Sequence, residues 1–257
     1  MLENDLVPEA WPVLLAMDTA TDRVHLALHD GARVHSVSLP GGAQASSTLL
    51  PSMQQLLADH GRAWGEVQAL ACGLGPGAFT GLRTACSVAQ GLALGLACPV
   101  MGLDTLMAVA EDARQRHPAR VAAGQRVWVL QDARMAELYV AAYEWDGQRW
   151  HEVVPAALWP QDEPARRWAV ATADGPGLVL VGSGLAVWPE SLSPTLLARG
   201  AHLDDLAVPS GAALIALAGE AWRRDQTTDA ALLLPRYVRD KVAQTTAERL
   251  QSRQATA

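Results

Sequence analysis

A glycine-rich segment at residues 73–83 carries the residue types best suited to binding a charged group. It reads GLGPGAFTGLR and lies between an expected strand at 67–72 and an expected helix at 80–96. Glycine permits positive φ and close backbone approach, and the free N–H groups at a helix start can bind an anion. Arg83 lies in the first turn of the expected helix, where a positive charge is unfavourable. An anion bound nearby would explain its presence. A tight strand-to-helix turn without a ligand explains the glycines equally well.

A second candidate group is formed by Asp18, the last residue of an apolar strand expected at 13–18, and by Thr19, which follows it. In phosphotransferases whose folds begin with three strands, an acidic residue at this point holds a metal-bound phosphate. The alternative is a turn that Asp18 caps, with Thr19 hydrogen-bonded locally. Asp132 and Arg134 occupy the corresponding place in the second half, where we expect a structural ion pair of Arg134 with either Asp132 or Glu137. Neither Walker A nor GxGxxG spacing is present, so these segments define no nucleotide motif by themselves.

The other polar residues exclude several classes of site. The histidines show no HExxH spacing, the three cysteines (Cys72, Cys86 and Cys98) show no CxxC spacing, and there is no GxSxG elbow. His25 and His29 are four positions apart, but on the expected strand their Cα atoms would lie about 13 Å apart, too far to hold one metal together. We therefore expect no bound metal and no serine-hydrolase site. The cysteines lie in apolar segments and are expected to be reduced. A formal charge of −7, from 20 Lys and Arg against 27 Asp and Glu, disfavours binding of nucleic acid by this chain alone.

The N-terminus and the apolar stretches of the sequence indicate where in the cell the protein is found. The first residues have neither the basic start nor the apolar run of a signal peptide. The most apolar stretch, residues 85–103, is interrupted by Gln90, Gly91 and Pro99, whereas a membrane span needs roughly 20 mostly apolar residues. We therefore expect a cytoplasmic protein that has no contact with a membrane.

The elements that must position these groups follow an order that occurs twice. Alternating or apolar runs predict three opening strands at 13–18, 23–29 and 33–39, then a helix, a strand, a helix, a strand and a helix up to residue 115. The second half also opens with three strands, expected at 126–131, 137–144 and 148–154. This order predicts an α/β protein with a duplicated fold: an N-terminal lobe at 12–117, a C-terminal lobe at 118–240 and a polar tail at 241–257.

Two helices of the first half carry patterns that suit packing. The expected helix at 80–96 has small residues four apart, at Gly81, Ala85, Ala89 and Ala93, which let another helix approach closely. That helix could be internal or on another chain. The helix around Leu49–Leu57 has an apolar stripe, which faces a core more often than an interface.

Several segments together resemble the TsaB (YeaZ) family of tRNA threonylcarbamoyladenosine biosynthesis proteins. They are LLAMDTATDRVHLAL, GLGPGAFTGLRTACSVAQGLALG, GLDTLMAVA, DARMAELY and the late PRYVR at 235–239. The resemblance covers most of residues 13–239. It implies a two-lobed actin/Hsp70-like fold (ASKHA, ribonuclease H-like), which agrees with the duplicated order of strands. One departure is Ala45, where many relatives have a histidine.

The resemblance also implies a role and its residues. Such proteins are non-catalytic scaffolds that bind and activate the catalytic paralogue TsaD, together with the ATPase TsaE, to modify adenosine 37 of tRNA. It implies no tightly bound cofactor, ATP or ADP only at the complex interface, and indirect tRNA contact. A surface that binds a paralogue can also pair with itself, so the sequence leaves a monomer and a homodimer open for the chain alone. The expected partner face comprises Leu49, Leu50, Met53, Leu82, Ala85, Cys86 and Ala89. A degenerate nucleotide or anion loop would comprise Asp18, Thr19, Gly75, Gly77, Thr80, Gly81 and Arg83.

Two other functions compete with this one. Related proteins have been labelled metal-dependent peptidases, which metal analysis of the pure chain would test. A small-molecule kinase is compatible with the fold, but it needs Asp18 and the glycine segment to hold Mg-ATP within one chain.

Overall fold

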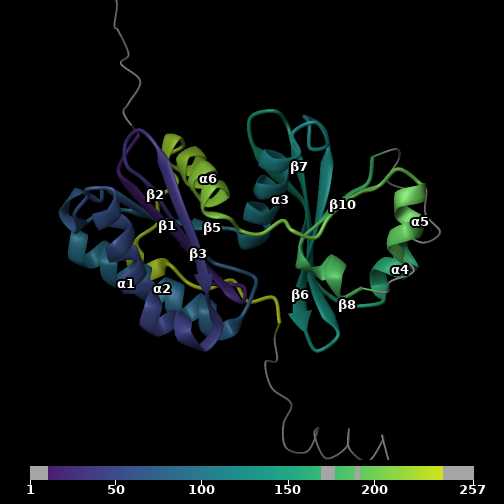
Figure 1. Ribbon diagram of the computed structural model, residues 1–257, viewed down its shortest axis with the longest axis horizontal. Helices are drawn as coiled ribbons and strands as arrows, with labels where there is room; N and C mark the ends of the chain where they lie inside the picture. Colours follow the sequence, from purple (N-terminus) through teal and green to yellow (C-terminus); the bar gives the residue numbers. More distant parts are fainter. Residues whose placement is uncertain (1–10, 169–176, 189–191, 240–257) are drawn as a thin grey trace, which may run out of the picture.

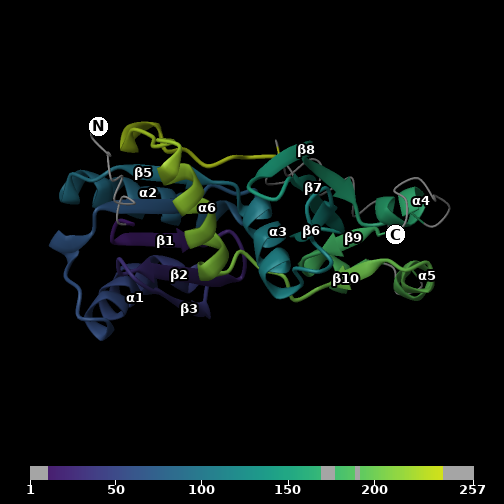
Figure 2. The same ribbon diagram turned by 90° about the horizontal axis from the view of Figure 1, so that it is seen from above.

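A computed structural model describes residues 11–168, 177–188 and 192–239. Its strands form two separate sheets, seen side by side in Figures 1 and 2. The first sheet has the order β3-β2-β1-β4-β5, with bounds β1 Leu14–Asp18, β2 Arg23–His29, β3 Val34–Pro40, β4 Ala69–Gly73 and β5 Val100–Leu103. β1 pairs antiparallel with β2 and parallel with β4.

The second sheet repeats this topology with the order β10-β9-β6-β7-β8. Its strands are β6 Arg126–Arg134, β7 Glu137–Trp145, β8 Trp150–Pro160, β9 Val179–Val181 and β10 His202–Asp204. In both sheets the first strand lies at the centre, with the antiparallel second strand on one side and a parallel fourth strand on the other. The expected two-lobed ASKHA fold, with three consecutive strands opening each lobe, is confirmed.

The first sheet is covered on both faces. Helices α1 (Ala45–Asp59) and α2 (Phe79–Leu96) pack on one face, and α6 (Gly211–Arg223) packs on the other. The pleat of β1 shows why its residues are all apolar except Asp18: Leu15 and Met17 pack with α1 and α2, whereas Leu14 and Ala16 pack with α6.

The second sheet also has helices on both faces. Helix α3 (Thr105–Arg116) packs on the face turned toward α6, and the core between these two helices is continuous. The opposite face is covered by α4 (Glu163–Trp168), α5 (Leu192–Ala198) and the short helix η3 (Ser183–Ala186). Trp128 and Trp168 pack edge to face in this core, with ring centroids 5.4 Å apart.

The helices cross the expected division between residues 117 and 118. All strands of the first sheet precede it and all strands of the second follow it. Helix α3, however, precedes the division and packs on the second sheet, whereas α6 follows it and packs on the first (Figure 2). The lobe ranges 12–117 and 118–240 therefore do not describe two separately packed bodies, and the tail at 241–257 lies outside the described residues.

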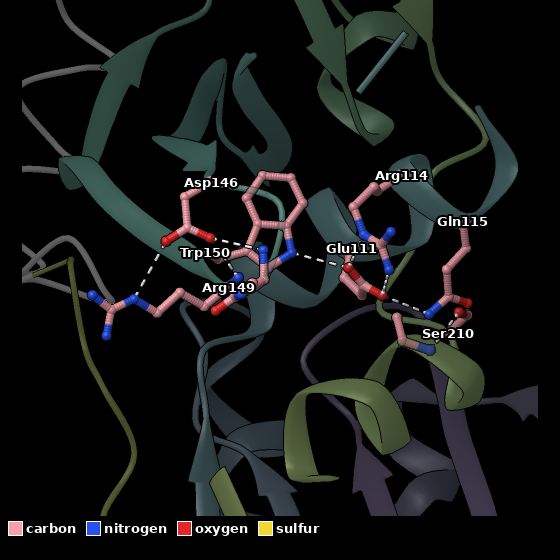
Figure 3. A network of polar contacts seen from close by, with 9 residues as sticks. Glu111, Arg114, Gln115, Asp146, Arg149, Trp150 and Ser210 are labelled. Atoms are coloured by element: carbon pink, nitrogen blue, oxygen red, sulfur yellow. Dashed lines mark hydrogen bonds and ion pairs between the residues drawn. The ribbon is translucent and has the colours of Figure 1, made fainter. Parts of the chain in front are cut away.

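Glu111 fixes α3 on the second sheet (Figure 3). Its carboxylate is buried and accepts hydrogen bonds from Arg114 at two distances of 2.7 Å, from Gln115 at 2.8 Å and from the indole of Trp150 on β8 at 3.0 Å. Arg114 in turn lies over the ring of Trp145, 4.4 Å from its centroid.

No helix in the described ranges is long and apolar enough to cross a bilayer.

Candidate functional site

The end of β1 and the start of α2 touch through their backbones. Thr19 Oγ1 donates a hydrogen bond to the carbonyl oxygen of Gly81 over 2.7 Å, and the Ala78 N–H donates to the carbonyl oxygen of Ala20 over 2.7 Å. A Cβ at Gly81 would overlap the carbonyl oxygen of Thr19, and one at Gly77 would overlap Ala20. The sequence needs these two glycines because two backbone segments meet here without space for a side chain.

Asp18 lies beneath this junction and has no exposed surface. Its Oδ1 accepts from the Ala20 N–H over 2.7 Å and its Oδ2 accepts from the Thr105 hydroxyl over 2.6 Å. A Cβ at Gly73 would overlap the carboxylate. Burial raises the pKa of Asp18 from 3.8 to about 6, opposed by its two hydrogen bonds. This setting does not fit a metal-bound phosphate, so the turn-capping alternative describes Asp18.

Thr105 extends this network to Gly75. Its hydroxyl accepts from the Gly75 N–H over 3.0 Å, and its own N–H donates to the Gly75 carbonyl oxygen over 3.1 Å. Gly75 has φ +100°, a conformation that favours glycine. The structure thus brings Asp18, Thr19, Gly75, Gly77 and Gly81 together as expected, but their contacts are with one another and with neighbouring backbone.

Arg83 and Thr80 lie apart from this buried network. Thr80 is exposed and does not cap α2, whose N-cap is Ala78. The Arg83 guanidinium lies over the Phe79 ring at 3.7 Å from its centroid, and its Nε donates to the Tyr237 hydroxyl over 3.0 Å. The positive charge of Arg83 is therefore stabilised by the Phe79 ring and the Tyr237 hydroxyl. The bound anion suggested by the sequence is not needed to explain this arginine.

A cleft of about 560 Å³ opens between the lobes at this point. Its walls include the turn after β1, the start of α2, the end of β6, residues of β7 and η3, and the last described residues of the chain. They include Ala20–Asp22, Gly77–Phe79, Gln131–Arg134 and Arg236–Arg239. The cleft lies where the C-terminal ends of the two central strands, β1 and β6, face each other.

The charges in this cleft are largely paired within the chain. Arg134 Nη1 lies 2.9 Å from Asp132 Oδ2, the ion pair expected from the sequence, and Arg239 pairs with Glu137. Two polar side chains on the wall are more than nine-tenths buried, Gln131 and Tyr139. Within the described ranges, no group of three or more His, Cys, Asp or Glu side chains could hold a metal ion.

The expected partner-face residues lie mostly inside the first lobe. Leu49, Met53, Leu82, Ala85, Cys86 and Ala89 are at most 3% exposed. All of them except Leu82 belong to the core between α1, α2 and the first sheet, and Leu82 lines the cleft. Only Leu50 is on the surface, 43% exposed. The chain by itself buries these six side chains, so their contact with a partner stays a prediction. The small-residue row of α2 likewise brings that helix close to its own lobe.

These features occur in a chain with clear relatives. A protein of Escherichia coli (strain K12) named tRNA threonylcarbamoyladenosine biosynthesis protein TsaB is 32% identical to it over 234 residues, 90% of this chain and 96% of the relative. The chain belongs to the TsaB family. A protein of the same name from Haemophilus influenzae is 30% identical, over 89% of this chain and 94% of the relative.

Solved structures and a second family agree with membership of the TsaB family. The structure described as YeaZ from Pseudomonas aeruginosa has 32% identity and a TM-score of 0.72, and covers 88% of this chain and 100% of its own. A second structure, of a protein "with similarity to peptidase YEAZ", gives a TM-score of 0.74 with 89% and 100% covered. Residues 41–166 also match the family described as TsaD: tRNA N6-adenosine threonylcarbamoyltransferase.

One part of the site in this TsaB-family chain was missed by reasoning from residue types. Arg236, Tyr237 and Arg239 line the cleft, although the PRYVR segment entered the sequence analysis only as part of the resemblance. The available signal was that two arginines flank a tyrosine in a late segment without helical or strand periodicity. Nothing in the spacing indicates which distant residues they contact.

Proposed function

We propose that this chain is a non-catalytic accessory subunit in the synthesis of N6-threonylcarbamoyladenosine on tRNA. The observation that carries the proposal is the burial of Asp18 in a TsaB-family chain. In the kinase alternative this carboxylate must reach a metal-bound phosphate, but here both of its oxygens accept hydrogen bonds from Ala20 and Thr105. An accessory subunit retains the fold of a catalytic paralogue without needing that contact.

We further propose that the partner is the paralogue TsaD, with the ATPase TsaE joining the complex in the cytoplasm. Support comes from the match of residues 41–166 to the TsaD family, since two proteins of one fold can pair through equivalent helices. The outer faces of α1 and α2 are the proposed docking surface, and their exposed apolar side chains are Leu50 and Leu94. A homodimer through the same surface is expected when the partner is absent.

In this proposal nucleotide binds at the complex interface and not tightly to the isolated chain. The backbone groups of Gly75 and Ala78 already make hydrogen bonds within the chain, and Arg83 is engaged by Phe79 and Tyr237. Contact with tRNA is assigned to the partner, in keeping with the net charge of −7.

The proposal is tested by depleting the protein in its host and quantifying threonylcarbamoyladenosine in bulk tRNA by nucleoside mass spectrometry. We expect the modified nucleoside to be lost on depletion and restored by the unmodified gene. Complementation by Asp18→Asn separates the alternatives: a scaffold keeps its activity, whereas a kinase that uses Asp18 loses it. Unchanged nucleoside levels after depletion would remove the proposed function.

A further inference from the structure

The last described part of the chain, Thr228–Arg239, forms a strap along the first lobe. The Thr228 N–H donates to the Val100 carbonyl oxygen over 2.8 Å, which covers the free edge of β5. Leu233 is 1% exposed in the core of the first lobe, and Gln90 of α2 donates to its carbonyl oxygen over 3.1 Å. The strap is therefore anchored to the first lobe by a main-chain hydrogen bond from Thr228, by a hydrogen bond from the Gln90 side chain and by a buried leucine.

The strap then crosses between the lobes, where Figure 1 shows it in yellow below α3 and α6. The Arg236 N–H donates to the Leu74 carbonyl oxygen over 2.7 Å, and the Tyr237 ring lies 5.0 Å from the Phe79 ring. The Arg236 side chain bridges two elements: Nη1 lies 2.9 Å from Asp104 Oδ2 at the start of α3, and Nη2 lies 3.2 Å from Glu152 Oε2 on β8.

Arg239 makes the second contact with the other lobe. Its Nη2 donates to the Ala133 carbonyl oxygen over 3.1 Å and to Glu137, and the Arg239 side chain is 15% exposed. It thereby holds both ends of the β6–β7 turn. This turn contains three consecutive non-glycine residues with positive φ, at residues 134–136. Such a backbone persists only where surrounding contacts fix it.

The strap joins the lobes beside the cleft together with contacts made by α3. These are its apolar packing against α6 and the hydrogen bonds of Thr105 with Asp18 and Gly75. Because contacts at one helix leave rotation about that helix as the softest motion, the angle between the lobes also depends on the strap, which reaches β8 and the β6–β7 turn. The link that the strap makes consists of a few polar contacts near the surface, made by Arg236 and Arg239.

We propose that the strap is a clamp that fixes the angle between the lobes and the width of the cleft. Its first-lobe end is permanently seated, and its second-lobe end is held by Arg239 and by the contact of Arg236 with Glu152. Breaking the second-lobe contacts releases the lobes to rotate about the α3–α6 packing. The clamp is a property of this chain alone and holds whether or not the proposed function is correct.

The test is an interlobe distance measurement by electron paramagnetic resonance in the full chain. Spin labels are placed at Gln54→Cys on α1 and at Gln148→Cys in the β7–β8 turn, both exposed positions. The partly exposed Cys98 is changed to serine, while Cys72 and Cys86 are buried. In this background, Arg239→Ala with Glu152→Ala is expected to broaden the distance distribution and shift it to longer values.

The matched control removes an equivalent pair from the same sheet without touching the strap. Arg126 and Glu144 lie 4.0 Å apart on β6 and β7, with their side chains 46% and 40% exposed, and their double alanine variant should keep the original distribution. A clamp-variant distribution that coincides with that of the unmodified chain would overturn the proposal, as would equal broadening in the control.

A second variant loosens the strap from the first lobe. Tyr237→Ala removes the contacts with Phe79 and Arg83 while leaving every second-lobe residue unchanged. The clamp requires this variant to broaden the distribution as well. Near-ultraviolet circular dichroism reports whether each variant keeps its packed tryptophans, so a wider distribution can be attributed to lobe motion in a folded chain. A folded Tyr237→Ala variant with unchanged distances contradicts the clamp.

Discussion

Thr19 and Gly81, 62 residues apart in sequence, are in direct contact: the threonine hydroxyl donates to the glycine carbonyl oxygen over 2.7 Å. There is no space between them for a β-carbon on residue 81. This contact holds the first turn of α2 against the end of β1. The glycine-rich segment is thus explained by close packing within the lobe.

The first prediction compares two glycines of α2. Gly81→Ala should destabilise the fold by about 2–4 kcal/mol, because the new methyl group meets the backbone of Thr19 and not a side chain that can move. Gly91→Ala is the control: its Cβ would meet nothing within 4 Å, and alanine should stabilise the helix by about 0.5–1 kcal/mol. Urea denaturation measures both, and equal effects would contradict the packing role of Gly81.

The second prediction concerns the buried carboxyl of Asp18. Its pKa is raised from 3.8 to about 6 by burial, so the folded state binds a proton that the unfolded state releases between these values. The stability contributed by that proton is lost as pH rises from about 4 to 6, and the loss by pH 7 is on the order of 3 kcal/mol. The difference in unfolding free energy between the unmodified chain and Asp18→Asn should therefore change by this amount over that range.

Asp22→Asn provides the control for this titration, since it changes an exposed carboxylate in the same loop. This variant shows how much of any change comes from removing one negative charge from the loop. If the Asp18→Asn difference stayed constant from pH 4 to pH 7, Asp18 would not titrate as its burial requires.

Local patterns were sufficient to predict most of the elements. The alternation of Val24, Leu26 and Leu28 predicted β2, and the apolar run at 13–18 predicted β1, whose residues are apolar because both of its faces are covered. Elements without enough residues to show a period were missed: α4 has 6 residues, α5 has 7 and β10 has 3. The positions of α4 and α5 depend on the sheet that they cover, and the position of β10 depends on its pairing with β9.

The sequence could not decide which surface each pattern faces. An apolar stripe such as Leu49–Met53 shows that a helix face is buried, but a partner chain and the chain's own sheet bury it equally well. The structure places it on the sheet. Contacts between segments far apart in sequence are harder still to predict, because Arg83 and Tyr237 meet over 154 positions of sequence. Residue types alone therefore suggested a ligand where the chain supplies its own partner.

The third prediction concerns Glu111, which joins α3 to β8. Glu111→Ala leaves the Trp150 indole N–H without its acceptor and Arg114 without its carboxylate. We expect a loss of about 2–3 kcal/mol, less than for a fully buried pair because Arg114 is 27% exposed. Glu220→Ala breaks an exposed helical pair with Arg224 and should cost no more than ~0.5 kcal/mol. Similar losses in the two variants would show that the Glu111 network adds nothing.

The fourth prediction tests the proposed docking surface on α1 and α2. Substituting Ala85 or Ala89 with leucine would disturb the chain's own core, because both are fully buried. The informative positions are Leu50 and Leu94, which are 43% and 83% exposed. Glutamate at either position should change the stability of the isolated chain by less than ~0.5 kcal/mol. In a complex with TsaD, a charge in a desolvated contact should cost about 1–3 kcal/mol, which weakens binding roughly tenfold to a hundredfold.

Leu206→Glu is the matched control for this surface, because Leu206 is 68% exposed in the segment after β10. It introduces the same charge outside α1 and α2, so binding to TsaD measured by calorimetry should be unchanged. Reduced binding for Leu50→Glu or Leu94→Glu, with Leu206→Glu unaffected, locates the contact on the two helices. If Leu206→Glu alone weakened binding, the partner would dock on the second lobe, and the buried stripe of α1 would have only its role in the core.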